Sequence, residues 1–71
     1  MSKEIRLKLG KRMRQLRKKC SYTQQKLSEV ADMGYKYIQR LEGKNPPAVK
    51  IDTIAKLAKT FKIPISKLLN F

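Results

Sequence analysis

The sequence predicts a small all-α domain of five short helices. Apolar residues recur at the three- and four-residue spacings of helices, and no segment shows the alternation typical of a strand. The chain has 71 residues, of which 41% are hydrophobic. A chain of this size buries only about 60% of the surface that it exposes when unfolded, enough for one core. We therefore expect a single domain over residues 1–71.

The first helix is predicted over residues 3–19. Its apolar stripe ends in Cys20, which we expect to be a half-buried packing thiol without catalytic function, because no general base accompanies it. Gly10 lies inside the pattern and destabilises the helix by about 1 kcal/mol relative to Ala. Its presence indicates close packing at this position or a late, frayed helix start. The stripe consists of Ile5, Leu9, Met13, Leu16 and Cys20.

Two short helices follow, over residues 24–31 and 35–42. Thr23 suits an N-cap, and Tyr22 and Leu27 have the spacing of a hydrophobic staple. The first of these helices is expected to bury Leu27, Val30 and Ala31 and to stop at Asp32 and Met33.

The second begins after Gly34, with Met33 and Ile38 as another staple. Ile38 and Leu41 are expected to point inward, and Gly43 is expected to end the helix as its C′ residue. The outer face then carries Tyr35, Lys36, Gln39 and Arg40. The spacing of the two staples implies a tight turn between two helices.

The loop over residues 43–47 contains two adjacent prolines, which exclude helix and favour an extended path. A fourth helix is predicted from about Ile51, with a fifth over residues 65–69 whose first turn contains Pro64. The apolar face of the fourth helix consists of Ile51, Ile54, Ala55, Leu57, Ala58 and Phe61.

Composition excludes several functions. One cysteine and no histidine exclude an internal disulfide and a Cys/His zinc site. The three glycines form no phosphate loop, and the five acidic residues are scattered, so we expect no enzyme, metal, cofactor or small-molecule ligand. No apolar run approaches the roughly 20 residues of a membrane span, and the N-terminus lacks the apolar region of a secretory signal. We expect a cytoplasmic protein that does not enter a membrane.

Charge indicates a polyanionic partner. The net charge is +13, from 18 basic and five acidic residues. Nucleic acid is the first candidate and anionic lipid the second, because summed charge steers association without dictating the fold. Half of the basic residues lie in the first helix: Lys3, Arg6, Lys8, Lys11, Arg12, Arg14, Arg17, Lys18 and Lys19.

From Leu9 to Leu69 the order of motifs resembles the Cro/CI-type helix-turn-helix domain of phage repressors and xenobiotic-response-element regulators. The matching pieces are Leu16-Arg17-Lys18, Thr23-Gln24-x-x-Leu27, Ala31-x-Met33, Tyr37-Ile38-Gln39-Arg40-Leu41-Glu42-Gly43-Lys44, the run over residues 52–59 and the run over residues 65–69. Their joint spacing is far more specific than any one piece.

The resemblance implies a helix-turn-helix over about residues 23–42, with residues 35–42 in the major groove of double-stranded DNA. It implies base contacts from Tyr35, Lys36, Gln39 and Arg40; the alternative is an ordinary solvated helix face. It implies contacts to the DNA backbone from Thr23, Gln24, Gly34, Lys44 and Asn45; for Lys44 and Asn45 the alternative is a solvated loop.

Arg17 and Glu42 match family positions that form a structural ion pair, the alternative being an exposed pair of little energetic value. The position of Asp32 is usually Gly in this family, because the chain turns there through positive φ. Asp tolerates that conformation at some cost.

We therefore expect a sequence-specific transcriptional regulator that acts as a dimeric repressor or autoregulator on a palindromic operator. The last residues of the chain carry more apolar surface than a small core readily covers, which indicates an interface. The candidates for the dimer interface are Ile65, Leu68, Leu69 and Phe71. The alternative for these residues is packing in the core. The competing functions are a cationic module that binds membrane surfaces or polyanions in general, and an antitoxin-like module that binds protein.

Overall fold

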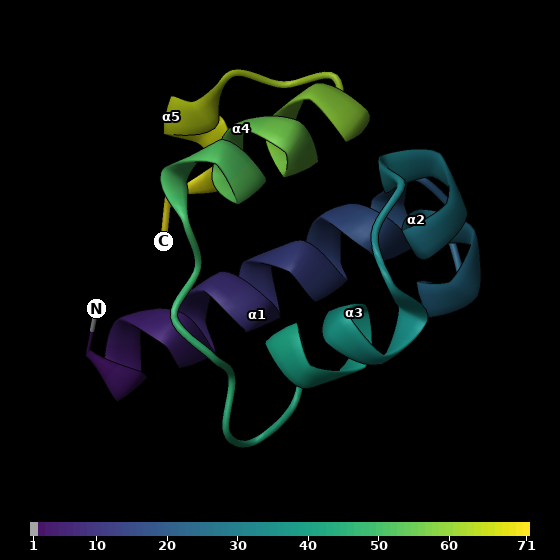
Figure 1. Cartoon of the computed structure of the whole chain (residues 1–71). Coiled ribbons are helices and arrows are strands. Elements are labelled where there is room, and N and C mark those ends of the chain that lie inside the picture. Colours follow the sequence, from purple (N-terminus) through teal and green to yellow (C-terminus); the bar gives the residue numbers. More distant parts are fainter. Residues whose placement is uncertain (1) are drawn as a thin grey trace.

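A computed structural model describes residues 2–71. Five helices follow one another: α1 (Lys3–Lys19), α2 (Gln24–Ala31), α3 (Tyr35–Leu41), α4 (Ile51–Thr60) and α5 (Ile65–Leu68). Figure 1 shows α1 running across the molecule, with α4 and α5 above it and α3 below it. The part of the chain that the structure describes contains no strand, and the prediction of an all-α fold of five helices is confirmed.

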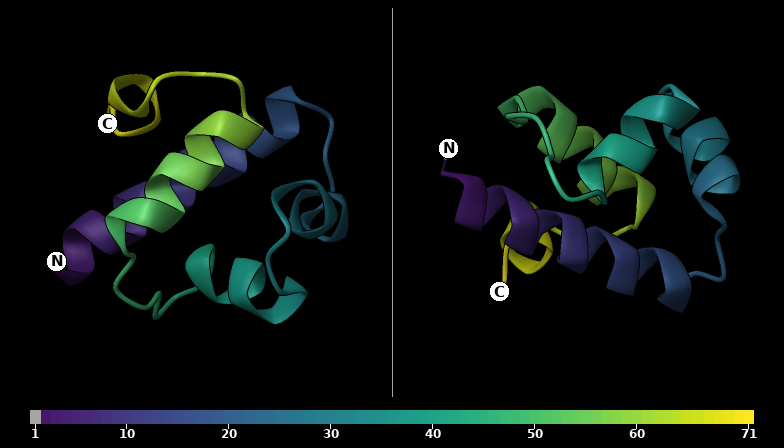
Figure 2. Two further views of the ribbon diagram at one scale, coloured as in Figure 1. Left: turned by 45° about the horizontal axis from the view of Figure 1, so that its top comes forward. Right: turned by 90° about the horizontal axis from the view of Figure 1, so that it is seen from below.

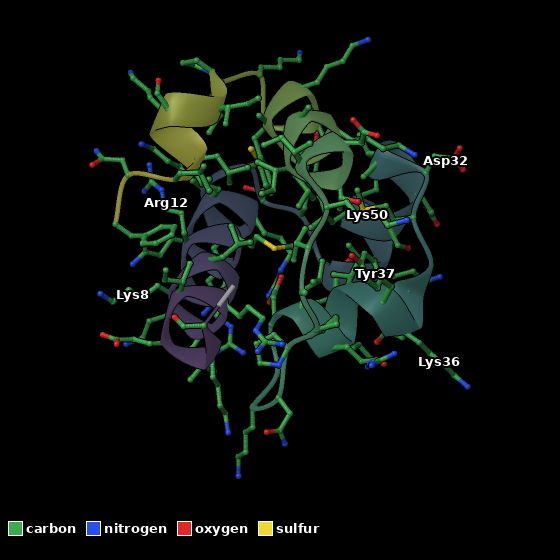
Figure 3. The ribbon with its side chains drawn as sticks, turned by 60° about the vertical axis from the view of Figure 1, so that its left-hand side comes forward. Lys8, Arg12, Asp32, Lys36, Tyr37 and Lys50 are labelled. Carbon is green, nitrogen blue, oxygen red and sulfur yellow. The ribbon has the colours of Figure 1, made fainter. Side chains whose placement is uncertain are left out.

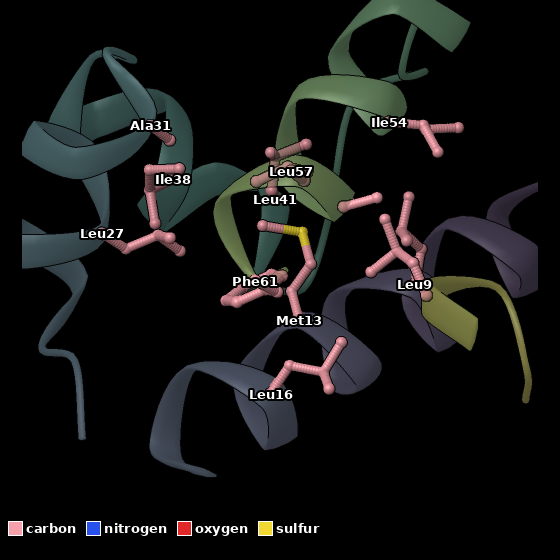
Figure 4. Packing of buried hydrophobic residues seen from close by; sticks show 12 residues of the cluster. Leu9, Met13, Leu16, Leu27, Ala31, Ile38, Leu41, Ile54, Leu57 and Phe61 are labelled. Carbon is pink, nitrogen blue, oxygen red and sulfur yellow. The ribbon is translucent and has the colours of Figure 1, made fainter. Parts of the chain in front are cut away.

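The core lies between the five helices, each of which contributes buried apolar residues. Leu9, Met13 and Leu16 of α1 point toward Leu57 of α4 and Phe61, the C-cap of α4, in Figure 4. The full set of buried apolar residues is Leu9, Met13, Leu16, Leu27, Ala31, Ile38, Leu41, Ile54, Leu57, Ala58, Phe61 and Leu68. Helical stripes spaced along the sequence therefore converge on one hydrophobic cluster.

Several residues of the predicted stripes are outside this core. Ile5 and Ile51 are exposed, because each lies in the first turn of its helix, beyond the reach of the neighbouring elements. Ala55 is also exposed, on the outer side of α4. Cys20 is exposed as the C-cap of α1, so the expectation of a half-buried thiol is wrong.

The inward face of α2 differs from the prediction by one position. Val30 is 44% exposed, whereas Ser28 is buried with Leu27 and Ala31. Ser28 can enter the core without an unpaired hydroxyl, because its Oγ donates to the carbonyl oxygen of Gln25 at 2.6 Å. The interpretation of Val30 as a core residue is therefore wrong.

Three helix ends use the left-handed backbone conformation at residues that are not glycine. Ser21, Asp32 and Lys62 have φ values of 60°, 55° and 59°. Each is followed by a residue whose N–H donates five positions back: Tyr22 to Arg17, Met33 to Ser28 and Ile63 to Ala58. This is the Schellman bond, which satisfies carbonyl groups left free at a helix C-terminus. The sequence predicts positive φ at Asp32 alone.

The glycines serve other purposes, and none of the three has positive φ. A Cβ on Gly10 would collide with the carbonyl oxygen of Leu41, so this glycine permits the close approach of α1 to the end of α3. Gly43 follows the C-cap Glu42, but without the left-handed conformation expected of a C′ glycine. α3 and α5 each end one residue earlier than predicted, at Leu41 and Leu68.

Candidate nucleic-acid interface

The two helices α2 and α3 pack directly against each other, joined by residues 32–34. At the start of α2, the Oγ1 of Thr23 accepts from the N–H of Lys26 at 3.0 Å, as an N-cap does. Tyr22 and Met33, the outer members of the two staples, are partly buried against the core. These contacts fix the angle at which each helix begins, and Figure 2 shows the resulting arrangement from two sides.

The outer face of α3 is exposed. Tyr35, Lys36, Gln39 and Arg40 are all exposed, whereas Ile38 and Leu41 on the opposite face are buried. The Nε2 of Gln39 donates to the Oη of Tyr35 at 3.2 Å, which links two of the four exposed side chains. In Figure 3 the labelled Lys36 projects away from the body of the protein. The four residues therefore form one continuous polar surface, here called the α3 face.

A buried carboxylate anchors the end of α3. The Oε2 and Oε1 of Glu42 accept from the Nε and Nη2 of Arg17, each at 3.0 Å. The Glu42 side chain is 0% exposed and that of Arg17 only 12%. The Nη1 of Arg17 also donates to the carbonyl oxygen of Tyr22 at 2.9 Å. Arg17 thus ties α1, the turn before α2 and the end of α3 together.

Two further side chains complete this cluster. The Nε2 of Gln24 donates to the Oε1 of Glu42 at 3.3 Å, and the Nε of Arg14 lies 3.5 Å from the same oxygen. Arg14 was missed in the sequence interpretation, because no local spacing reveals a contact between residues 28 positions apart. Because two cations surround one carboxylate, the charge of Glu42 at the end of α3 is compensated within the protein.

The predicted backbone-contacting residues surround the α3 face in different ways. Lys44 and Asn45 are exposed on the loop after α3. Gly34 is exposed as the N-cap of α3, and a Cβ there would meet nothing within 4 Å. Thr23 and Gln24, at the start of α2, already make the cap and Glu42 contacts, so only part of their hydrogen-bonding capacity is free.

The four C-terminal candidates for a dimer interface separate into two kinds. Leu68 is 0% exposed and belongs to the core, so the interpretation of this residue as part of an interface is wrong. The reason is that α5 packs on both α1 and α4, which places its inward position under cover. Ile65 and Phe71 are 36% and 50% exposed, and Leu69 is partly buried against the core.

Another arginine holds α5 in place. The Nε and Nη2 of Arg12 both donate to the carbonyl oxygen of Lys67, at 3.2 and 2.8 Å. This cation at the C-terminal end of α5 satisfies a carbonyl that the short helix leaves free. Some basic residues of α1 therefore hold other parts of the fold in place, whereas others make no such contact with the residues that the structure describes.

Among the helices of residues 2–71, none combines the length and the apolar character that crossing a membrane requires. No curated protein and no solved structure matches the chain closely enough to be significant. A family model described as a helix-turn-helix domain matches residues 10–70. The match covers α2, the turn and α3 together with most of the core, and it confirms the resemblance to Cro/CI-type domains. The chain belongs to the helix-turn-helix domain family of DNA-binding regulators.

Proposed function

We propose that this protein is a sequence-specific regulator of transcription that binds double-stranded DNA through the α3 face. It acts as a dimeric repressor or autoregulator at a palindromic operator, with residues 1–71 forming one helix-turn-helix domain. The observation that carries the proposal is the α3 face itself: four exposed side chains able to address bases, on a helix whose other face is buried.

The chemistry of these four side chains suits the major groove. Arg40 and Lys36 have the donors to address O6 and N7 of guanine, and Gln39 can pair with adenine. Tyr35 can contact a thymine methyl group or a phosphate. The bond from Gln39 to Tyr35 supports this function, because it orders two of these side chains before DNA arrives.

The electrostatics of the surroundings favour a polyanion. Glu42 is buried between arginines and Gln24, so it presents no exposed carboxylate to the DNA. Lys44 and Asn45 are exposed immediately after α3, where they can contact phosphates on either side of the bases that α3 reads.

A dimer follows from the small reach of one helix-turn-helix. Two copies whose recognition helices lie about 34 Å apart, one turn of DNA, read a site long enough to be specific. Ile65, Leu69 and Phe71 are the residues that we assign to the interface, because they combine an apolar surface with partial or full exposure at one end of the chain.

The test is binding to duplexes selected from a random pool, measured against salt and against competitor DNA. A dimer that neutralises about 6 to 10 phosphates should lose roughly 10³ to 10⁵-fold in affinity between about 50 and 200 mM salt. The selected duplex should retain its advantage over random competitor across this range. Equal affinity for the selected duplex, random duplex and anionic vesicles would instead establish a general polyanion-binding module.

A further inference from the structure

A groove of about 310 Å³ lies outside the α3 face, between the first turns of α1 and the loop that follows α3. In Figures 1 and 2 this loop passes beside the N-terminal part of α1. The groove is lined by Lys3, Arg6, Asn45, Pro46 and Pro47, and no acidic residue is among them. Residues about 40 positions apart in the sequence therefore form one cationic groove.

Arg6 is held in a defined position at this groove. Its Nη1 donates to the carbonyl oxygen of Pro46 at 3.4 Å, and its Nε donates to the carbonyl oxygen of Ser2 at 3.4 Å. An arginine has five N–H donors, so the Nη2 and half of Nη1 remain free for an acceptor. Pro46 is buried and Pro47 partly buried, which keeps the loop in place against α1. The guanidinium is thus ordered before any ligand binds.

The other polar side chains that line the groove do not hold parts of the fold together as Arg6 does. Lys3 and Asn45 are exposed, and neither side chain hydrogen-bonds to another described residue. Glu4, the acidic residue next in sequence, pairs with Lys8 at 3.5 Å and does not line the groove. One fixed guanidinium, one ammonium and one amide suit a phosphodiester, which accepts hydrogen bonds and carries one negative charge.

We propose that Lys3, Arg6 and Asn45 form a phosphate-binding site for the DNA strand that flanks the bases read by α3. The proposal rests on the proposed function and extends it, because it assigns the start of α1 to the DNA interface. The loop runs directly from the end of α3, so a strand that leaves the α3 face beside Lys44 meets this groove next. The site contributes affinity without sequence preference, since it addresses only the backbone.

The test compares the double variant Lys3→Gln/Arg6→Gln with the wild type on the selected duplex and on random duplex. The control is Lys18→Gln/Lys19→Gln, which removes the same charge from exposed positions at the other end of α1. With a salt slope of about 0.9 per phosphate, each lost contact costs about tenfold in affinity at about 0.1 M salt. We expect a loss of about 10 to 100-fold per protomer on both duplexes, a slope lower by about 1 to 2 per protomer, and an unchanged base preference.

Folding is controlled separately, because Arg6 also contacts Pro46. Lys3→Gln alone changes an exposed residue with no such contact, and it should give about a tenfold loss per protomer with an unchanged melting temperature. Neutral methylphosphonate groups introduced one at a time into the duplex should weaken the wild type at one flanking phosphate, and the double variant should be insensitive there.

The outcomes separate the two proposals. If the double variant binds like the Lys18→Gln/Lys19→Gln control while Arg40→Ala alters base preference, the groove is not a phosphate site and the proposed function stands. If the wild type shows no preference among duplexes, the proposed function fails and this inference fails with it.

Discussion

Replacing Arg17 with alanine should destabilise the fold strongly, since it leaves the Glu42 carboxylate buried without its main partner. Both hydrogen bonds of 3.0 Å are lost, together with the bond to the carbonyl oxygen of Tyr22. Breaking a buried ion pair by removing one partner costs about 3–5 kcal/mol. Arg14, which is half exposed, and Gln24 remain near the carboxylate, so we expect a somewhat smaller cost, about 2–4 kcal/mol.

This loss is large for so small a domain. At about 0.05–0.15 kcal/mol per residue, a chain of 71 residues has a total stability of about 4–11 kcal/mol. Each kcal/mol shifts the melting temperature of such a domain by about 4–8 °C, so Arg17→Ala should melt roughly 8–32 °C below the wild type. Circular dichroism at 222 nm, in thermal and urea titrations, measures both quantities.

The control for this prediction is Lys18→Ala, which removes the neighbouring charge from an exposed position of the same helix. Substitutions at such sites usually change stability by less than about 0.5 kcal/mol. If Arg17→Ala unfolds with the same free energy as Lys18→Ala, the pair with Glu42 contributes little and its role as an anchor of α3 is refuted.

Five further substitutions test three other parts of the structure. Asp32→Gly and Ser21→Gly should each raise stability by up to about 1 kcal/mol in urea titrations, because glycine removes the strain of positive φ; a clear loss in both would contradict the left-handed helix ends. Gly10→Ala should lower stability by about 1–3 kcal/mol despite the higher helix propensity of alanine, because its Cβ meets the Leu41 carbonyl. Gly34→Ser, whose side chain points into open space, should raise stability by a few tenths of a kcal/mol. If Gly10→Ala were the more stable variant of the two, close contact between α1 and α3 would be excluded. Phe71→Asp should leave the melting curve nearly unchanged and convert the proposed dimer to a monomer in light scattering; a dimer that persists places the interface elsewhere.

The helices could be predicted closely because their signals are local. Thr23 caps α2 in the structure as its sequence position indicates, and the stripe Leu9, Met13 and Leu16 forms the centre of the core. Local signals also lead to the errors. Val30 is apolar like a core residue, but the direction from which α3 and α4 approach α2 decides which face is buried, and that direction is a tertiary property.

The contacts within the site depend on tertiary structure even more. The resemblance implies the pairing of Arg17 with Glu42, yet the additional contacts of Arg14 and Gln24 join three helices and have no signature in the sequence. The same holds for Arg6, whose bond to Pro46 spans 40 positions. The positive φ of Ser21 and Lys62 was missed because neither position carries a glycine, the residue that usually indicates this conformation.

The most direct test of the α3 face as a reader of DNA sequence is to select duplexes from a random pool with the wild type and with Arg40→Ala in parallel. The wild type should enrich a palindrome whose half-site centres lie about 34 Å apart. Arg40→Ala should bind this palindrome about 1–3 kcal/mol more weakly and relax the preference at one base pair of each half-site, with an unchanged melting temperature. Enrichment of the same palindrome with the same affinity by both proteins, or of no sequence by the wild type, would contradict sequence readout by α3.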